Sequence, residues 1–267
     1  MGKISKIRGD TITLATARAY ATVLGIPPGF NAVEVNVPSA TIEAILVGFG
    51  PRIRRIYYYD ASVPQWIEYT TQGTDRNTLS LIPLSEMQTA DRLYVGATRR
   101  HAGWSVDVVG TNAAGTASGV WEYPADKVWT TLSATQTGVR TTAVFDKDGL
   151  VTWTVPANSL WLAERLVDVA GEALAAPKTE PLFWTRVRPD AAFTDTSVTL
   201  AELTALFNDT LNVLTLDNEG QSAIRILSHA GGMQPYRIPL DTDRYGSIEL
   251  VSATLTSAAH INWLAQE

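Results

Sequence analysis

The residues best suited to acid–base or metal chemistry in this sequence are its three histidines, His101, His229 and His260. None of them lies at metal-ligand spacing from another histidine or from a carboxylate, and metal sites cluster their ligands. His101 follows Arg99-Arg100 at the end of an expected strand, which favours a position in a surface loop. We therefore expect no metal site at any of the three histidines.

Ser228-His229, taken with Asp217 or Asp241, has the residue types of a hydrolytic triad. The sequence has no Gly-x-Ser-x-Gly elbow, no phosphate-binding loop and no dinucleotide-binding glycine motif. It also has no cysteine, which excludes disulfides and thiolate metal sites. These observations predict a protein that is not an enzyme, has no catalytic residues and uses no cofactor.

Two acidic segments have some of the residue types of a calcium site. The first, Asp146-Lys147-Asp148-Gly149, passes directly into an apolar strand and has no Glu at the twelfth position of a calcium loop, which favours an Asp-Gly hairpin turn. The second comprises Asp217-Asn218-Glu219, Asp241 and Asp243, which could bind a cation between subunits but are also ordinary turn residues. The sequence thus predicts no metal ligand.

The densest basic residues are Arg52, Arg54, Arg55, Arg99 and Arg100. Such a cluster can bind phosphate, but acidic residues flank it and the formal net charge of the chain is -6. Direct nucleic-acid binding is therefore not expected. Two interpretations stay open, contact with an acidic neighbouring subunit and a solvated edge, and we take Arg54, Arg99 and Arg100 as candidate assembly contacts.

Aromatic residues are abundant, with eight Trp among the 267 residues. Exposed aromatic rings can bind sugars, so a carbohydrate-binding module is one interpretation of this set. The rings recur, however, at matched places in two repeats, and matched positions of this kind are typical of a core. We expect most of them to be buried, Trp129 and Trp153 among them, with a few exposed for assembly.

The composition is that of a globular β protein large enough for two or three domains. Hydrophobic residues make up 45% of the chain and charged residues 18%, and abundant β-branched and aromatic side chains suit half-buried strands. The N-terminal segment has a basic start without an apolar stretch behind it, so we expect no secretory signal. No apolar run approaches the roughly 18 residues of a membrane helix, and no membrane partner is expected.

The repeat that organises the sequence occurs at residues 56–95 and again at 121–187. Each copy has an aromatic strand, a polar connection, a second strand that opens with Trp, a Pro-ended apolar strand and a closing strand. The alignment makes Trp66 equivalent to Trp129, and Pro83 equivalent to Pro156. Repeated β units of this kind usually build scaffolds and contact surfaces.

The second copy contains an insert at residues 159–181 that the first copy lacks. Leu162, Leu166 and Val169 recur there at helical spacing, which predicts a short helix, although Trp161-Leu162 could equally continue a strand. These apolar side chains need cover from this chain or from the next one. We therefore take Leu162, Leu166 and Val169 as further candidate assembly contacts.

A second helix is predicted from residue 199 onward. Thr199 and Glu202 form a capping box, and Leu200 and Leu203 share one helical face.

Together these patterns predict a mainly β fold with tandem jelly-roll-like β-sandwich units, a small C-terminal β unit and one or two short helices. The small polar segment at residues 110–119 is the best boundary candidate. We expect an N-terminal β-sandwich domain at 1–112, a second at 113–209 and a small C-terminal β domain at 210–267. The last is near the lower size limit for independent stability, so it should lean on the rest of the chain or on a neighbouring subunit.

Within the second copy, the motifs stand at Gly119-Val120-Trp121-Glu122-Tyr123, Val128-Trp129-Thr130-Thr131-Leu132, Asp148-Gly149-Leu150-Val151-Thr152-Trp153-Thr154-Val155-Pro156 and Phe183-Trp184-Thr185-Arg186-Val187. With the preceding segment at 91–97, these motifs resemble a module of tailed-bacteriophage virion structural proteins. The resemblance covers residues 55–206, and the stretch from Asp148 to Pro156 is its most specific part. The insert at 159–181 departs from the family pattern.

The resemblance implies a particle protein without a catalytic signature. It would be a capsid decoration or cement protein bound to the assembled head, or alternatively a tail or head–tail connector protein. The implied partners are other copies of the chain and other virion proteins, either the major capsid protein or tail proteins. The implied location is the virion, assembled in the host cytoplasm. A carbohydrate-binding module of a receptor-binding assembly is the alternative from another class.

Overall fold

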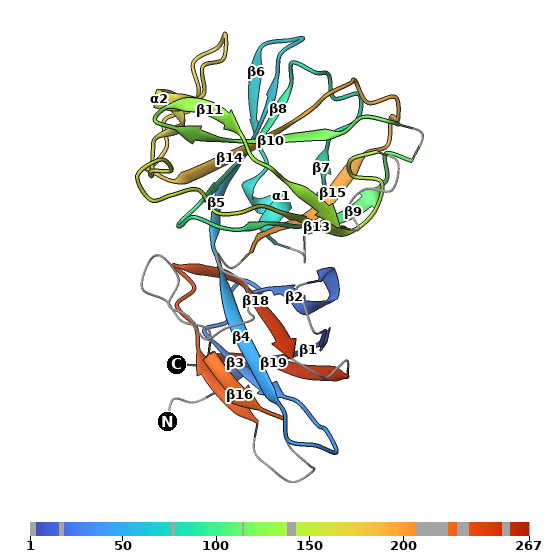
Figure 1. Ribbon diagram of the computed structural model, residues 1–267, viewed down its shortest axis with the longest axis vertical. Helices are drawn as coiled ribbons and strands as arrows, with labels where there is room; N and C mark the ends of the chain where they lie inside the picture. Colours follow the sequence, from blue (N-terminus) through green and yellow to red (C-terminus); the bar gives the residue numbers. More distant parts are fainter. Residues whose placement is uncertain are drawn as a thin grey trace.

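In the computed structural model, the described residues are 4–15, 19–75, 78–113, 115–137, 143–206, 224–228, 235–252 and 257–266. The chain is mainly β, with 51% strand and 5% helix, which confirms the expected fold class. Its described helices are α1 (Thr70–Thr74), α2 (Leu166–Val169) and the single 3-10 turn η1 (Tyr20–Thr22), and α2 is the short helix expected in the insert. Figure 1 shows the strands gathered into two domains stacked along the long axis of the molecule.

One domain, which we call the terminal domain, is built from both ends of the chain, residues 4–51 and 224–266 (Figure 1). Its first sheet has the order β1 (Ile4–Thr13), β19 (Ala258–Gln266), β3 (Ala32–Asn36) and β17 (Tyr236–Pro239). Its second sheet has the order β16 (Ile224–Leu227), β4 (Ala44–Pro51), β18 (Tyr245–Ser252) and β2 (Val23–Gly25).

The core of the terminal domain shows why the two ends of the sequence need each other. Val33 and Val35 on β3 pair with Trp263 and Ile261 on β19, and all four side chains are buried in one cluster. The described strands after residue 224 thus complete sheets begun by the N-terminal strands, and the expected separate C-terminal domain at 210–267 is not formed. The boundaries expected at 112 and 209 also do not follow the sheets, because residues 53–206 make one further domain. The strand expected at 211–216 lies outside the described residues.

The other domain, which we call the repeat domain, holds both copies of the sequence repeat in two facing sheets. The six-stranded sheet has the order β11 (Val128–Thr131), β10 (Gly119–Ala125), β14 (Phe183–Pro189), β8 (Arg92–Ala97), β5 (Ile53–Asp60) and β6 (Gln65–Glu68). The five-stranded sheet has the order β12 (Thr135–Thr137), β13 (Gly149–Thr152), β9 (Gly103–Gly110), β15 (Thr199–Ala205) and β7 (Ile82–Pro83).

The two copies take equivalent places in the six-stranded sheet. Trp66 pairs with Tyr59 in the second residue pair from the β5–β6 turn, and Trp129 pairs with Pro124 in the second pair from the β10–β11 turn. The predicted equivalence of the two tryptophans is therefore confirmed. The closing strands β8 and β14 lie side by side in the middle, where Tyr94 is paired with its own counterpart in the other copy. An approximate two-fold axis passes through this central pair.

In the five-stranded sheet the copies exchange strands. β7 of the first copy pairs with β15, which follows the second copy, and β13 of the second copy pairs with β9, which follows the first. Instead of tandem separate sandwiches, the repeats form one two-sheet domain in which each completes the sheet of the other. The predicted equivalence of Pro83 and Pro156 is not seen, because Pro83 is paired within β7 whereas Pro156 follows the end of β13.

The helix predicted from residue 199 is wrong, because this segment forms strand β15. Pairing with β9 on one side and β7 on the other supplies the backbone hydrogen bonds that a helix would otherwise make. The register shifts between Thr199 and Glu202, which rephases the strand, so that Leu200 and Leu203 both reach the core. A bulged strand and a helix thus give the same apolar spacing here.

The core between the two sheets of the repeat domain is aromatic. Trp104, Trp121 and Trp161 are fully buried in it, and Trp153 is 6% exposed. Trp104 meets Trp121 and Trp153 edge-on, with ring centres 6.3 and 6.2 Å apart. Trp129, which was also expected in a core, is only half-buried.

Replacement of Trp153 with alanine is expected to lower the free energy of unfolding by about 3–5 kcal/mol. Truncation would leave a cavity beside Trp104 and an unpaired carbonyl at His101, which accepts a hydrogen bond from Trp153 Nε1 at 2.8 Å. Urea unfolding measures the change. Leu79→Ala, at a side chain that is 100% exposed, is the control and should shift the value by less than about 0.5 kcal/mol. Wild-type stability of Trp153→Ala would show that this ring contributes nothing to the core.

Candidate functional site

The insert of the second repeat, residues 159–181, lies across the outer face of the six-stranded sheet, and we call it the strap. Antiparallel bridges fix it at two points, between Ala125 and Trp161 and between Glu164 and Leu182. Helix α2, which was expected in this segment, forms one turn in the middle of the strap. The strap is therefore the main difference between the two repeats, because the first repeat has no equivalent segment.

Three indole N–H groups of the sheet hold the backbone of the strap. They donate from Trp184 to the carbonyl of Glu164 at 2.8 Å, from Trp129 to Val169 at 2.6 Å and from Trp66 to Leu174 at 3.1 Å. Trp66 and Trp129 are the equivalent residues of the two copies, so the strap spans the approximate two-fold axis and binds both halves.

The inner face of the strap is buried against the sheet. Leu166 is 0% and Val169 4% exposed, and both pack in a cluster with Tyr59, Tyr94 and Trp184. Their expected role as assembly contacts is therefore wrong: the outer face of this sheet carries aromatic rings, and the chain covers these rings with its own apolar side chains.

A buried ionic network lies beneath the strap at the two-fold axis. Arg186 Nε donates to Glu122 at 2.8 Å, and Arg186 Nη1 lies 3.3 Å from Glu172 of the strap, with side chains 9–14% exposed. The Arg186 guanidinium stacks over the Trp129 ring, 4.2 Å from its centre. Tyr94 donates its hydroxyl hydrogen to Glu172, and burial together with this carboxylate raises the pKa of Tyr94. Glu122, Glu172 and Arg186 were not among the expected site residues. Their only signal in the sequence is a charge within an otherwise apolar or aromatic segment.

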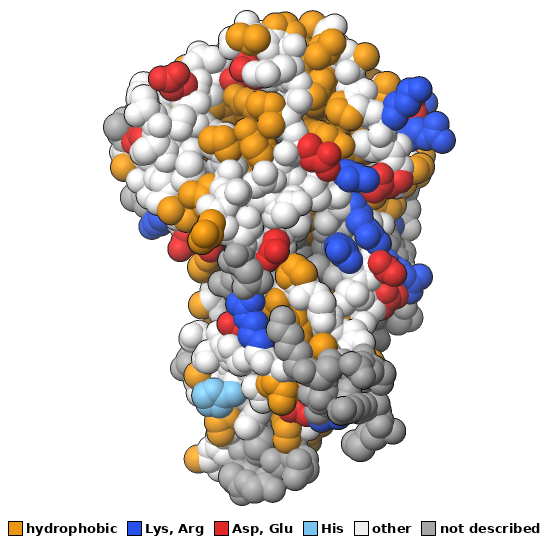
Figure 2. Space-filling view, turned by 180° about the vertical axis from the view of Figure 1, so that it is seen from behind, with side chains coloured by type: hydrophobic (Ala, Val, Ile, Leu, Met, Phe, Trp, Pro, Cys, Tyr) orange, Lys and Arg blue, Asp and Glu red, His pale blue; other side chains and the backbone are white. Residues whose placement is uncertain are grey.

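The outer surface of the strap carries exposed apolar side chains beside charged ones such as Arg165 and Asp168. Leu162 is 49% and Leu160 46% exposed, and they flank Trp161, which bridges to Ala125 at the β10–β11 turn. We call Leu160 and Leu162 the apolar patch. Figure 2 shows hydrophobic side chains gathered on the upper half of the molecule, over the repeat domain.

The arginines predicted as assembly contacts take different positions. Arg54 lies between the domains, where Nη2 donates to Asp243 at 3.1 Å, and its side chain is 34% exposed. Arg100 is 4% exposed, bonded to the Asn158 side chain and placed over the Phe183 ring. Its expected role as a surface contact is wrong, because it is enclosed within the repeat domain. Arg99 is partly exposed.

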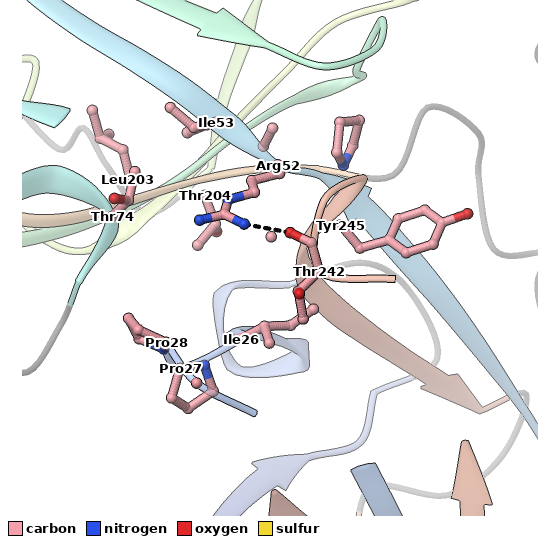
Figure 3. Close-up of a pocket in the computed structure, with 14 residues that line it drawn as sticks. Ile26, Pro27, Pro28, Arg52, Ile53, Thr74, Leu203, Thr204, Thr242 and Tyr245 are labelled. Atoms are coloured by element: carbon pink, nitrogen blue, oxygen red, sulfur yellow. Dashed lines mark hydrogen bonds between the residues drawn. The ribbon is translucent and has the colours of Figure 1, made fainter. Parts of the chain in front are cut away.

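A cavity of about 150 Å³ lies between the two domains (Figure 3). Ile26, Pro27 and Pro28 of the terminal domain form one wall, and Arg52 at the link from β4 to β5 donates from Nη1 to the Thr242 carbonyl at 2.5 Å. Its lining includes no histidine and no carboxylate. The cavity is smaller than ligand pockets, which begin at roughly 300 Å³. We therefore interpret it as a gap in the packing between the domains and not as a substrate site.

A second cavity between the domains, of about 220 Å³, is more polar. Asp107 and Glu202 are cross-strand partners on β9 and β15 and face it with the hydroxyl residues Thr11, Thr13 and Thr204. Two carboxylates alone do not make a cation site. Across the described ranges, no group of three or more His, Cys, Asp or Glu side chains is arranged to hold a metal ion.

His101 is fully buried, so the expected surface position is wrong. Its ring lies between Trp153 and Trp161, with ring centres 5.5 and 5.2 Å away, and Nε2 is 3.4 Å from the Thr185 hydroxyl. Burial lowers the pKa of His101 to about 4, opposed in part by a hydrogen bond to the Arg99 carbonyl. The histidine is therefore neutral at pH 7 and belongs to the aromatic core.

The other residues considered for chemistry have structural contacts where they are described. Ser228 is buried and exchanges hydrogen bonds with the backbones of Thr41 and Glu43, each at 2.8 Å; His229 and Asp217 lie outside the described residues. Asp148 accepts a hydrogen bond from the Val108 amide at 2.7 Å. The Asp-Gly hairpin expected there is not seen, because Gly149 already begins β13 and its hairpin partner β12 ends at residue 137.

Comparison of the chain with protein-family models, curated proteins and solved structures finds no match. Among the described helices, none has the length and apolar character to cross a bilayer.

Replacement of Arg186 with alanine is expected to lower the free energy of unfolding by about 3–5 kcal/mol, because Glu122 and Glu172 would remain buried without their partner. Chemical denaturation checks this value. Arg165→Ala removes the same charge from an exposed position of the strap and should change stability by less than about 0.5 kcal/mol. Equal effects of the two substitutions would contradict a buried network.

The stability of the protein is expected to fall as the pH drops from about 6.5 to 4. In this window the unfolded chain binds a proton at His101, whose unfolded pKa is about 6.5, while the folded chain resists it. The loss should reach about 3 kcal/mol below pH 4 and vanish above pH 7. Urea unfolding at several pH values measures it. His101→Gln should flatten the slope in this window, whereas His260→Gln, at an exposed position, should keep it.

Proposed function

We propose that this protein is a non-enzymatic structural protein of a tailed-bacteriophage virion, and specifically a decoration protein bound to the assembled capsid. The observation that carries the proposal is the strap, which buries apolar side chains against the sheet and exposes the apolar patch near its start. Its inner side chains are covered by the sheet, whereas Leu160 and Leu162 are 46% and 49% exposed. An exposed apolar patch on an element that is hydrogen-bonded to the sheet is typical of a protein contact surface.

The polar residues that could support another function are used within the fold. His101, Ser228 and Arg100 are buried in structural contacts, and the two cavities described above hold about 150 and 220 Å³. This arrangement favours a scaffold over an enzyme. The proposed partners are other copies of the chain and other virion proteins, in a particle assembled in the host cytoplasm.

A carbohydrate-binding role is less well supported. Six of the eight tryptophans are buried, and Trp66 and Trp129 are half-buried. Both of these use their N–H groups on the strap, and the Trp129 ring also carries the Arg186 guanidinium. A sugar platform needs an open ring face, and the structure leaves these rings little of it.

The proposal is tested on purified virions of the phage that encodes this protein. With an epitope tag on the chain, antibody labelling seen by electron microscopy should decorate the head surface. Label at the tail or neck would instead support a tail or connector protein. Intact particles without the protein would overturn the virion assignment.

Leu162→Asp is expected to reduce incorporation into particles at least about tenfold, because a charge would enter the apolar patch. The side chain is 49% exposed, so the fold should persist. Quantitative blotting of purified particles measures incorporation, and circular dichroism checks the fold. Leu79→Asp places the same charge at a 100% exposed site outside the patch and should incorporate normally. Equal incorporation of both variants would exclude the patch as a contact.

A further inference from the structure

Three arginines share the outer face of the six-stranded sheet beside the strap: Arg92 on β8, and Arg186 and Arg188 on β14. Arg186 and Arg188 are two residues apart in one strand, so they point to the same side. Arg186 is paired with Tyr94, which in turn shares a face with Arg92. We call Arg92, Arg186 and Arg188 the arginine cluster.

The carboxylates of the chain neutralise this cluster only in part. Glu122 lies 2.8 Å from Arg186 and 3.9 Å from Arg188, and Glu172 lies 3.3 Å from Arg186. Two carboxylates therefore lie among three guanidinium groups, and Arg186 makes the shortest contact with each of these carboxylates. Arg188 keeps only the long contact among the described residues.

Arg92 has no carboxylate partner within the part of the chain that the structure describes. Its Nη1 donates to the backbone carbonyls of Thr89 and Asp91 at 2.7 and 2.8 Å. Burial lowers the pKa of Arg92, and the positive charges of Arg186 and Arg188 lower it further, whereas Glu172 and Tyr94 raise it in part. Three cationic side chains are thus gathered here, although the chain as a whole carries a net charge of -6.

The cluster is also accessible. The Arg188 side chain is 32% exposed, and Arg92 is partly exposed. Glu172 of the strap forms an ion pair with Arg186, whereas the ion pair of Arg188 is with Glu122 of the sheet. An acidic side chain from outside can therefore approach between Arg92 and Arg188.

We propose that the arginine cluster is a carboxylate-binding site that receives an acidic side chain from a second copy of this chain in the assembled particle. Guanidinium groups bind carboxylates in a planar, two-pronged geometry. The chain itself supplies the ligand, because it has 27 acidic against 21 basic residues and exposes carboxylates such as Asp126 and Asp168 on the same domain. This inference rests on the proposed function, in which neighbouring copies meet.

Sedimentation velocity over a range of protein concentrations tests the proposal. The wild-type protein should self-associate at low salt, and 0.5 M NaCl should weaken this association. Arg188→Gln should raise the dissociation constant about tenfold. Arg165→Gln, which removes the same charge from an exposed site on the strap, should leave it unchanged. Arg188→Lys, which keeps the charge but loses the two-pronged geometry, should fall between wild type and Arg188→Gln.

Thermal unfolding shows whether each variant keeps its fold, and if Arg188→Gln does not, the comparison of Arg188→Lys with Arg165→Gln decides. A wild-type protein that stays monomeric at low salt would overturn the proposal, as would equal effects of the substitutions at Arg165 and Arg188. Particle labelling is an independent measurement. The protein can be found on virions even when this site fails, so the two failures are distinguishable.

Discussion

The pairing of the two repeats along β8 and β14 is the interaction on which the rest of the repeat domain depends. It joins the two halves of the six-stranded sheet, and it places Tyr94 opposite Arg186 at the centre. The exchange of β7 and β13 in the facing sheet follows from the same symmetry. Neither copy can bury its apolar strand without the other, so the duplication is a condition of folding and not a string of independent modules.

The strap is single because of this same symmetry. It lies across the approximate two-fold axis and accepts hydrogen bonds from the equivalent Trp66 and Trp129. A matching insert in the first repeat would have to occupy the same space. The buried charges follow from this placement, since Glu172 of the strap meets Arg186 on the axis itself. The ion network, the aromatic cluster and the apolar patch thus all result from the placement of one strap over the symmetric outer face of the six-stranded sheet.

The local elements were predictable from the sequence, because hairpins and aromatic positions follow short-range patterns. The β fold class, the matched Trp66 and Trp129 and the short helix in the insert were of this kind. Features set by distant partners were not. Strand β15 has helical apolar spacing that only its bulged pairing with β9 explains. The burial of His101 and Leu166 likewise depends on which remote segments cover them, and one sequence contains no signal for that.

The split terminal domain has a consequence for the order of events during synthesis. Its strands β1 to β4 leave the ribosome before the repeat domain, yet β1 pairs with β19 and β4 lies between β16 and β18. These early strands must therefore wait, with unpaired edges, until residues 224–266 have emerged. Contacts between ends so far apart in sequence form slowly because of the loop-closure entropy. Folding of the intervening repeat domain shortens that loop, so the nascent chain is most vulnerable to aggregation and to proteases at its first fifty residues.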